Sequence, residues 1–354
     1  MRAILRRELE GNEGDTSRCL LMREGDLVIL YKGHTEADYV FLAPGGVVDN
    51  KFGRFEHNDF IGQPFGSRIN SRGDKGWVLA LESTTDLWAA ANKTRTQIVD
   101  SVDSSIITTQ LDLFPGCAVV ESGTGSGNMT LAMAKCVAPT GHIHTYEYNG
   151  SRAEAARDDF AKLGLAGMIT VHHGDVCGKY HGSTGGFEGV VQHSVDAVFL
   201  DLPEPWLALD HAKYVLKPGR NICTYSPCME QVMRTCEALR EAGFFSVRMV
   251  EVRQRPFDAK YVQFEQPDTG RNSDNMFEIP NTVDSTEGEK ANSSQHSKKR
   301  KLVKLPEPPR SILCARPENS MKGHTAFLTF AYSPPPQLGE GTRGKDLGGD
   351  VVEI

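Results

Sequence analysis

The chain has 354 residues, of which 39% are hydrophobic and 24% are charged, which is enough for about two domains of ordinary size. Its 39 basic and 46 acidic side chains give a net charge of −7, and this argues against a chain that alone presents a broad positive face to nucleic acid. No apolar run is long enough to cross a bilayer, and the polar, acidic start lacks the apolar core of a secretion signal. We therefore expect a soluble protein inside the cell, without a membrane partner.

Residues 1–76 consist of short extended stretches separated by turns. Apolar side chains alternate over a few positions at 26–32 and 38–42, and glycine, asparagine or aspartate follows. This pattern is typical of hairpins and small barrels. We predict a small all-β, barrel-like domain over residues 1–76.

From residue 77 short apolar strands alternate with helices. Ile98, Val102 and Ile106 have helical spacing, and the apolar run at 117–121 suits a strand that is buried on both faces. Further strands are expected at 143–147, 168–172, 195–201, 221–225 and 246–253, with helices after residue 128, at 151–163 and at 230–242. This order predicts an α/β domain with a doubly wound, Rossmann-type parallel sheet over residues 77–266 and 323–335.

Residues 267–322 differ in composition from the rest of the chain. Only 13 of these 56 residues are apolar, so the segment cannot bury enough surface to offset the entropy lost on ordering. We predict a disordered polar insertion here. It interrupts the sheet domain, because residues 325–332 again have the pattern of a strand, and residues 336–354 are expected to form a flexible tail.

The strongest local signal is the loop Glu121-Ser122-Gly123-Thr124-Gly125-Ser126-Gly127-Asn128, between a predicted strand and a helix. Its glycines allow a tight turn and let a ligand approach the backbone, beside the unpaired N–H groups of a helix N-terminus. A dinucleotide-binding fingerprint would place glycine at position 128, which is Asn here. The spacing therefore favours S-adenosylmethionine, with a nucleotide or a purely structural turn as alternatives.

Acidic residues stand at the ends of successive predicted strands. Glu147 follows Glu121 by 26 positions, where a doubly wound fold places an acid that binds ribose hydroxyls. By the same topology Asp175, after the third strand, would reach an adenine edge. Each residue alone could instead be a solvated strand-end or turn carboxylate.

Asp201 ends the fourth predicted strand and begins the segment Asp201-Leu202-Pro203-Glu204-Pro205-Trp206. The two prolines stiffen the exit from the sheet, and Trp206 offers a flat surface on which a ring could stack. The segment resembles the Asp/Asn-Pro-Pro-aromatic motif of methyltransferases that act on ring-amine nitrogens. The alternative is an acidic turn followed by a core tryptophan.

Several motifs can be compared together with a known family. They are the loop at 121–127, the segment at 201–206, Ser226-Pro227-Cys228-Met229-Glu230-Gln231-Val232, Gly62-Gln63-Pro64-Phe65-Gly66-Ser67, Arg95-Thr96-Gln97-Ile98 and Gly323-His324-Thr325. Together they resemble the catalytic subunit of the eukaryotic tRNA (adenine-58-N1) methyltransferase family. The resemblance covers residues 20–265 and 323–332, and this sequence departs from the pattern mainly in its insertion and at positions such as Asn128 and Glu204.

The resemblance implies methyl transfer from S-adenosylmethionine to N1 of the T-loop adenine of tRNA. It also implies that two catalytic subunits assemble with two related non-catalytic subunits. Asp201 is implied as the catalytic residue, and the implied cofactor-binding residues are Gln97, Val99, Glu121, Gly123, Gly125, Ser126, Gly127, Asn128, Glu147, Arg152, Asp175 and Val176. The alternative is a non-catalytic RNA-binding paralogue that acts as an assembly platform, although such a protein has no need of a complete cofactor pocket.

The remaining motifs suggest no metal chemistry. The eight cysteines form no Cys-x-x-Cys pair, and His172-His173 has no partner at metal-binding spacing, so we expect no metal site and no disulfide. The basic cluster Lys298-Lys299-Arg300-Lys301, together with the family resemblance, leads us to expect a nuclear protein. A contact with tRNA phosphates and a merely solvated charge run are the alternatives for this cluster.

Overall fold

The computed structural model describes residues 20–33, 36–73, 76–92, 98–178, 184–255, 257–264, 310–317, 323 and 325–335. The chain divides into two compact units, Met1–Arg253 with Gly323–Ile354, and Gln254–Lys322. Gln97, the basic cluster at 298–301, the predicted tail at 336–354 and most of the predicted insertion lie outside the described residues. Within the described ranges, no helix is long and apolar enough to cross a membrane.

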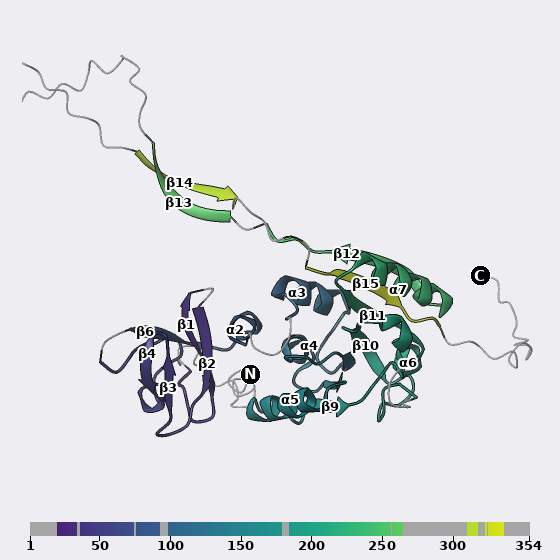
Figure 1. The fold of residues 1–354 in the computed structure, drawn as a ribbon, viewed down its shortest axis with the longest axis horizontal. Helices are drawn as coiled ribbons and strands as arrows, with labels where there is room; N and C mark the ends of the chain where they lie inside the picture. The colour runs from purple at the N-terminus through teal and green to yellow at the C-terminus, as the bar shows by residue number, and fades with distance from the viewer. Residues whose placement is uncertain are drawn as a thin grey trace, which may run out of the picture. The chain divides into compact units, whose positions relative to one another are not determined.

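The N-terminal part of the first unit is an antiparallel sheet with strand order β2-β1-β6-β5 (Figure 1). Its strands are β1 (Leu27–Gly33), β2 (Glu36–Phe41), β5 (Arg68–Asn70) and β6 (Trp77–Glu82), and a separate hairpin of β3 (Val47–Asn50) and β4 (Gly53–Glu56) precedes the short helix η1 (His57–Asp59). The prediction of an all-β N-terminal region is confirmed. Its boundary at residue 76 is wrong, because β6 pairs with both β1 and β5.

Helix α2 (Thr85–Ala91) follows this sheet, and the Thr84 side chain caps it by accepting a hydrogen bond from the Leu87 N–H at 3.1 Å. Trp88 on α2 is buried, and its ring lies 4.8 Å from the ring of Tyr39 on β2. The same apolar core includes Leu27 of β1 and Met133 of the α/β domain. One core therefore continues from the N-terminal sheet through α2 into the α/β domain.

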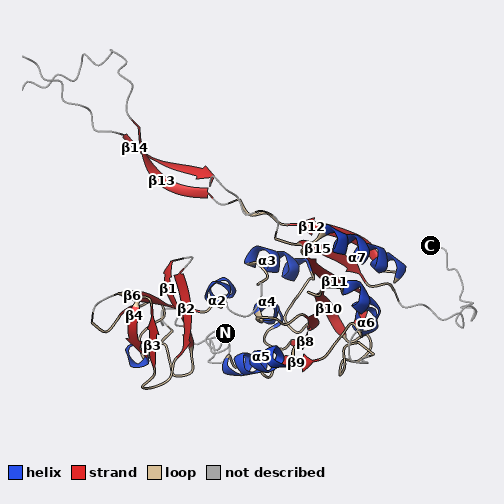
Figure 2. Cartoon of the chain, in the orientation of Figure 1, coloured by secondary structure: helices blue, strands red, loops and turns tan. Residues whose placement is uncertain are grey.

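The α/β domain contains a sheet of order β12-β15-β11-β10-β7-β8-β9 (Figure 2). Its strands are β7 (Ala118–Ser122), β8 (His142–Glu147), β9 (Ile169–His173), β10 (Val195–Leu200), β11 (Leu216–Ser226), β12 (Phe245–Glu251) and β15 (Phe327–Tyr332). Strands β7 to β11 run parallel, as predicted, but β15 is antiparallel to both β11 and β12. The sheet is therefore mixed.

Helices cover both faces of this sheet, which explains its continuous apolar strands. On one face Val119 and Phe199 share a core with Ile107 of α3, and on the other Val198 shares a core with Leu239 of α7. The helices are α3 (Ser101–Gln110), α4 (Asn128–Val137), α5 (Gly150–Lys162), η2 (Pro205–Ala208), α6 (Leu209–Val215) and α7 (Met229–Glu241). The doubly wound prediction is confirmed, and α2, η2 and α6 are elements that the sequence pattern did not reveal.

The second unit contains an antiparallel hairpin of β13 (Phe257–Phe264) and β14 (Arg310–Pro317). Two predictions are corrected here. The segment 257–264 belongs to this hairpin and not to the methyltransferase-type sheet, and residues 310–317 form a strand inside the range predicted as disordered. The apolar run Ile312-Leu313-Cys314-Ala315 suits a strand, but the polar average of the 56 residues around it concealed this run.

Candidate cofactor and catalytic site

A cavity of about 170 Å³ lies where β7, β8 and β10 end. These strands are parallel neighbours, with Ser122 in register with both Leu200 and Tyr146, so the residues that follow them meet at one edge of the sheet. The cavity is lined by Ile98, Val99, Gly123, Thr124, Gly125, Ser126, Asn128, Met129, Glu147, Arg152 and Asp201. The loop after β7 thus forms its floor together with the ends of β8 and β10.

Two glycines of this loop occupy positions that other residues do not tolerate. Gly123 has φ +99°, and a Cβ there would lie 2.3 Å from the backbone carbonyl oxygen of Asp201. Gly127 precedes α4 with φ +76°, and a Cβ there would lie 2.8 Å from the Phe160 ring. L-residues avoid such positive φ values. The glycines are therefore required by the packing of β7 against β10 and of α4 against α5.

Glu147 connects the loop to α5. Its side chain is 3% exposed, and Oε1 accepts hydrogen bonds from Arg152 Nη2 at 2.6 Å, Arg152 Nε at 3.0 Å and the Asn149 N–H at 2.9 Å. Oε2 accepts one from the Gly125 N–H at 3.0 Å. These bonds fix the carboxylate at the cavity wall, where it is available as an acceptor for hydroxyl groups of a ligand.

Asn128 offers unused hydrogen-bonding capacity to the same cavity. Its Oδ1 and Nδ2 atoms are both buried and have no partner within the described part of the chain. A buried amide is normally paired, so this side chain fits a ligand that both donates and accepts hydrogen bonds. The ammonium and carboxylate of a bound amino-acid group meet this requirement.

The carboxyl groups around the cavity are held in a poorly solvated environment. Burial, with a smaller effect from the charge of Glu147, raises the pKa of Asp201 to about 6. Glu121 lies deeper, and burial raises its pKa to about 7 although Thr130 Oγ1 donates a hydrogen bond to its Oε2 at 2.5 Å. A nearby positive charge would lower both pKa values, because it stabilises the charged form of each carboxyl group. The site is therefore suited to a cationic ligand such as a sulfonium.

The structure brings most of the predicted site residues together. Eight of them line the cavity, namely Val99, Gly123, Gly125, Ser126, Asn128, Glu147, Arg152 and Asp201. Ile98, Thr124 and Met129 also line it and were not predicted. They adjoin predicted residues in the sequence, so extending each motif by one residue would have included them.

Four predicted residues do not line this cavity. Glu121 is buried beneath the loop, Gly127 serves as the N-cap of α4, and Val176 is buried in the core of the sheet domain. Asp175 lines a separate cavity of about 730 Å³, and its Oδ1 accepts a hydrogen bond from the Cys177 N–H at 3.0 Å. The remaining predicted residue, Gln97, is outside the described ranges.

Trp206 differs from the expectation of an open stacking surface. The Arg234 guanidinium lies over its ring, 5.5 Å from the centroid, and the side chain packs partly buried against the core of the sheet domain. One face of this ring is therefore already occupied by a cation from α7.

The fold and the glycine-loop cavity define a Rossmann-type methyltransferase. Two solved structures share this fold: a SAM-dependent O-methyltransferase from Thermotoga maritima (TM-score 0.63, 25% identity, covering 91% of this chain and 97% of that one), and the tRNA (m1A58) methyltransferase TrmI from Aquifex aeolicus (TM-score 0.58, 20% identity, covering 88% and 98%).

Sequence comparison gives a more specific assignment. The family model "tRNA methyltransferase complex GCD14 subunit" matches residues 76–333. The tRNA (adenine(58)-N(1))-methyltransferase catalytic subunit of Dictyostelium discoideum is 34% identical over 319 residues, covering 89% of this chain and 97% of that protein, and that of Candida albicans is 31% identical over 335 residues, with the same coverage. The chain belongs to this family of tRNA methyltransferase complex subunits.

We expect Gly123→Ala to weaken cofactor binding at least tenfold and to lower the free energy of unfolding by about 2 kcal/mol. The added methyl would contact the Asp201 carbonyl oxygen at 2.3 Å and would force β7 and β10 apart. Titration calorimetry with S-adenosylmethionine and urea unfolding measure the two effects. Gly167→Ala is the matched control, because a Cβ there has no atom within 4 Å; equal behaviour of the two variants would show that the close approach at Gly123 does not shape the cavity.

Proposed function

We propose that this chain is the catalytic subunit that transfers the methyl group of S-adenosylmethionine to N1 of adenine 58 in tRNA. The observation that carries the proposal is the position of Asp201, which lines the same cavity as the glycine loop. The family membership supports the substrate, since the named relatives are catalytic subunits that act on this base.

The residues of the cavity are suited to hold this cofactor. Asn128 and the loop N–H groups would bind its amino-acid end, and Glu147, fixed by Arg152, would accept hydrogen bonds from ribose hydroxyls. Ile98 and Met129 add apolar surface. S-adenosylmethionine supplies a methyl group on a good leaving group, so the mechanism requires no protein nucleophile.

Asp201 has a distinct role in the transfer step. Adenine becomes a cation when N1 forms a bond to carbon, and positive charge develops on the ring as the transition state is reached. A carboxylate fixed beside the ring therefore stabilises the transition state more than the ground state, and it can accept a hydrogen bond from the exocyclic amine. Because N1 lies on the pairing edge of the base, the adenine has to leave its stack to reach Asp201.

We expect the complex with its partner to form N1-methyladenosine at position 58 of an unmodified tRNA transcript, detected after nuclease digestion. With Asp201→Asn the rate should fall about a hundredfold, because one preorganised electrostatic contact is lost. S-adenosylmethionine affinity should change only a few-fold. Asp210→Asn, an exposed acid on α6, is the control, and normal turnover by Asp201→Asn would refute the assigned role.

The same carboxyl predicts a pH profile. Its raised pKa of about 6 means that the reactive carboxylate form is lost as the pH falls through 6. We expect kcat/KM for S-adenosylmethionine, which reports the free enzyme, to fall about tenfold per pH unit below that value. The residual activity of Asp201→Asn should show no such step; a profile that is flat from pH 7 to 5 in the unaltered enzyme would contradict the assignment.

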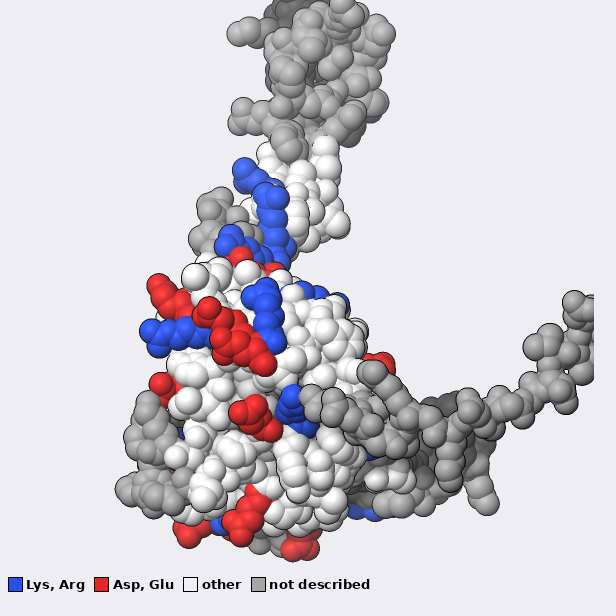
Figure 3. Space-filling view, turned by 90° about the vertical axis from the view of Figure 1, so that its right-hand side faces the viewer, with Lys and Arg blue, Asp and Glu red and all other residues white. Residues whose placement is uncertain are grey.

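We further propose that two copies of the chain assemble with two related non-catalytic subunits. The chain has a net charge of −7, which argues against a broad positive surface for tRNA on this chain alone. In Figure 3, acidic side chains lie beside several of the basic ones. A basic partner would supply that surface.

The hairpin β13–β14 supports a protein partner. Phe257, Tyr261, Ile312 and Leu313 are 60%, 71%, 51% and 58% exposed. Among the described strands, β13 and β14 pair only with each other. An isolated two-stranded hairpin is marginally stable in water, and large exposed apolar side chains mark interaction surfaces. A subunit that covers this hairpin would stabilise it and would bury its exposed apolar side chains.

We expect the isolated chain to be weakly active or inactive and to gain activity when its partner is co-expressed.

The double variant Tyr261→Ser with Ile312→Ser should lower the assembled fraction at least tenfold, because it removes apolar surface from the hairpin. Mass photometry measures assembly, and Met233→Ser, which alters an exposed methionine on α7, is the control. Full activity of the lone monomer would refute the partner requirement.

A further inference from the structure

A row of alternating cations and aromatic rings lies on the N-terminal sheet region. Arg68 lies over the ring of Trp77, with its guanidinium carbon 4.5 Å from the centroid. Lys32 Nζ lies 5.6 Å from the Trp77 centroid and 4.9 Å from that of Phe52, and Lys51 Nζ lies 5.0 Å from Phe52. We refer to Lys51, Phe52, Lys32, Trp77 and Arg68 as the cation–aromatic row.

Contacts between separate segments hold the row together. Lys32 belongs to β1, Trp77 begins β6, Arg68 begins β5, and the 51–52 turn joins β3 to β4. The Phe52 carbonyl oxygen lies so close to Gly76 that a Cβ at Gly76 would be 2.3 Å from this oxygen. The turn is thereby fixed against the start of β6, so the two rings are placed by the backbone and not by flexible side chains alone.

Two cations of the row have no carboxylate partner among the described residues. Lys51 is paired with Glu36 at 2.8 Å, and nearby Arg72 is paired with Glu56 at 2.8 Å and Asp59 at 3.2 Å. No described carboxylate lies within ion-pair distance of Lys32 or Arg68, and both side chains are exposed. Glu36, whose pKa is lowered mainly by its hydrogen bond to Lys51, interacts with the charge of Lys32 only at longer range.

The aromatic rings change what these two cations can do. A carboxylate would orient a lysine or an arginine but would also neutralise it, whereas a ring restricts the side chain and leaves its full charge available. Less side-chain entropy is then lost when an anion binds. Lys32 and Arg68 are therefore prepared for a negatively charged partner.

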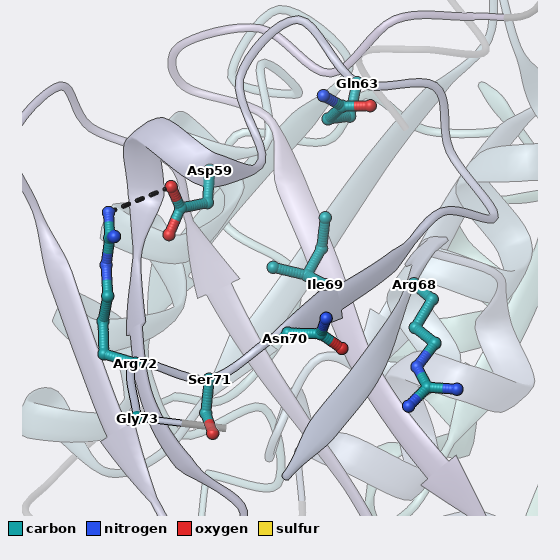
Figure 4. Close-up of a pocket in the computed structure, with 8 residues that line it drawn as sticks. All are labelled: Asp59, Gln63, Arg68, Ile69, Asn70, Ser71, Arg72 and Gly73. Carbon is teal, nitrogen blue, oxygen red and sulfur yellow. Dashed lines mark hydrogen bonds and ion pairs between the residues drawn. The ribbon is translucent and has the colours of Figure 1, made fainter. Parts of the chain in front are cut away.

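A polar hollow adjoins the Arg68 end of the row. Its volume is about 460 Å³, and its polar lining consists of Arg68, Gln63, Asn70, Ser71 and Arg72 together with the acidic Asp59. In Figure 4, Arg68 and Arg72 lie on opposite sides of Asn70 and Ser71, and Arg72 is held by Asp59. Amide and hydroxyl groups beside arginine are the donors that commonly bind backbone phosphates of nucleic acids.

We propose that Lys32, Arg68 and the adjoining hollow bind the phosphodiester backbone of tRNA, at a surface that shares no residue with the cofactor cavity. This inference rests on the proposed function, which makes tRNA the substrate. Because cations already lie over the ring faces of Trp77 and Phe52, the surface favours phosphates over stacked bases. It therefore contributes affinity and orientation without reading sequence.

The test compares the co-expressed complex with one that carries Lys32→Gln and Arg68→Gln, using fluorescently labelled unmodified tRNA. We expect Kd for tRNA to rise about tenfold at ~150 mM salt, and the slope of log affinity against log salt to become shallower by about 1.5, since each phosphate contact contributes roughly 0.7 to 0.9. KM for tRNA should rise, while kcat at saturating tRNA and Kd for S-adenosylmethionine stay unchanged.

The control double variant Lys162→Gln with Arg240→Gln removes the same charge from exposed positions on α5 and α7. If both double variants weaken tRNA binding equally, a general charge effect explains the result and the proposal is overturned. It is also overturned if Lys32→Gln with Arg68→Gln binds tRNA normally. Absence of N1-methyladenosine with the unaltered complex would instead refute the proposed function, so the two failures are distinguishable.

Discussion

The close approach of two backbones, at Gly123 and Asp201, is the constraint on which the site depends. The Gly123 backbone passes so near the Asp201 carbonyl that no side chain fits between them, and the Asp201 N–H donates a hydrogen bond to the Ser122 carbonyl at 2.9 Å. The loop that would bind the cofactor and the carboxylate that would face the base are thus parts of one packed unit. The position of the loop relative to this carboxylate follows from the pairing of β7 with β10.

This arrangement carries an electrostatic cost. Glu121 is fully buried and Asp201 is partly buried, and burial raises the pKa of each carboxyl. A carboxylate that is charged while it is shielded from water destabilises the folded chain at neutral pH, relative to a neutral side chain of the same size. A site that gathers negative charge in a dry pocket is stabilised by a positively charged ligand, which links cofactor binding to the stability of the domain.

The sequence allowed the α/β architecture, the glycine loop and the acids at the strand ends to be predicted, because each depends on local periodicity or on the regular topology of parallel strands. It did not reveal that β6 belongs to the N-terminal sheet, because the pairing of Trp77–Glu82 with β1 depends on contacts about fifty residues apart. Strand β14 was missed because its partner precedes it by a similar distance and its surroundings are polar. The contacts among Lys32, Phe52 and Trp77 join three separate segments of the chain. They therefore could not be predicted from a motif of neighbouring residues.

Strand β15 occupies an interior position in the sheet, between β11 and β12, although it follows both in the sequence by many residues. As the chain leaves the ribosome, β11 and β12 are therefore made well before the strand that joins them. Until Phe327–Tyr332 emerges, both strands expose an unpaired edge, and such edges invite premature association with other chains. The nascent protein thus completes its sheet late, and a shortened translation product would lack the strand that connects one edge of the domain to its centre.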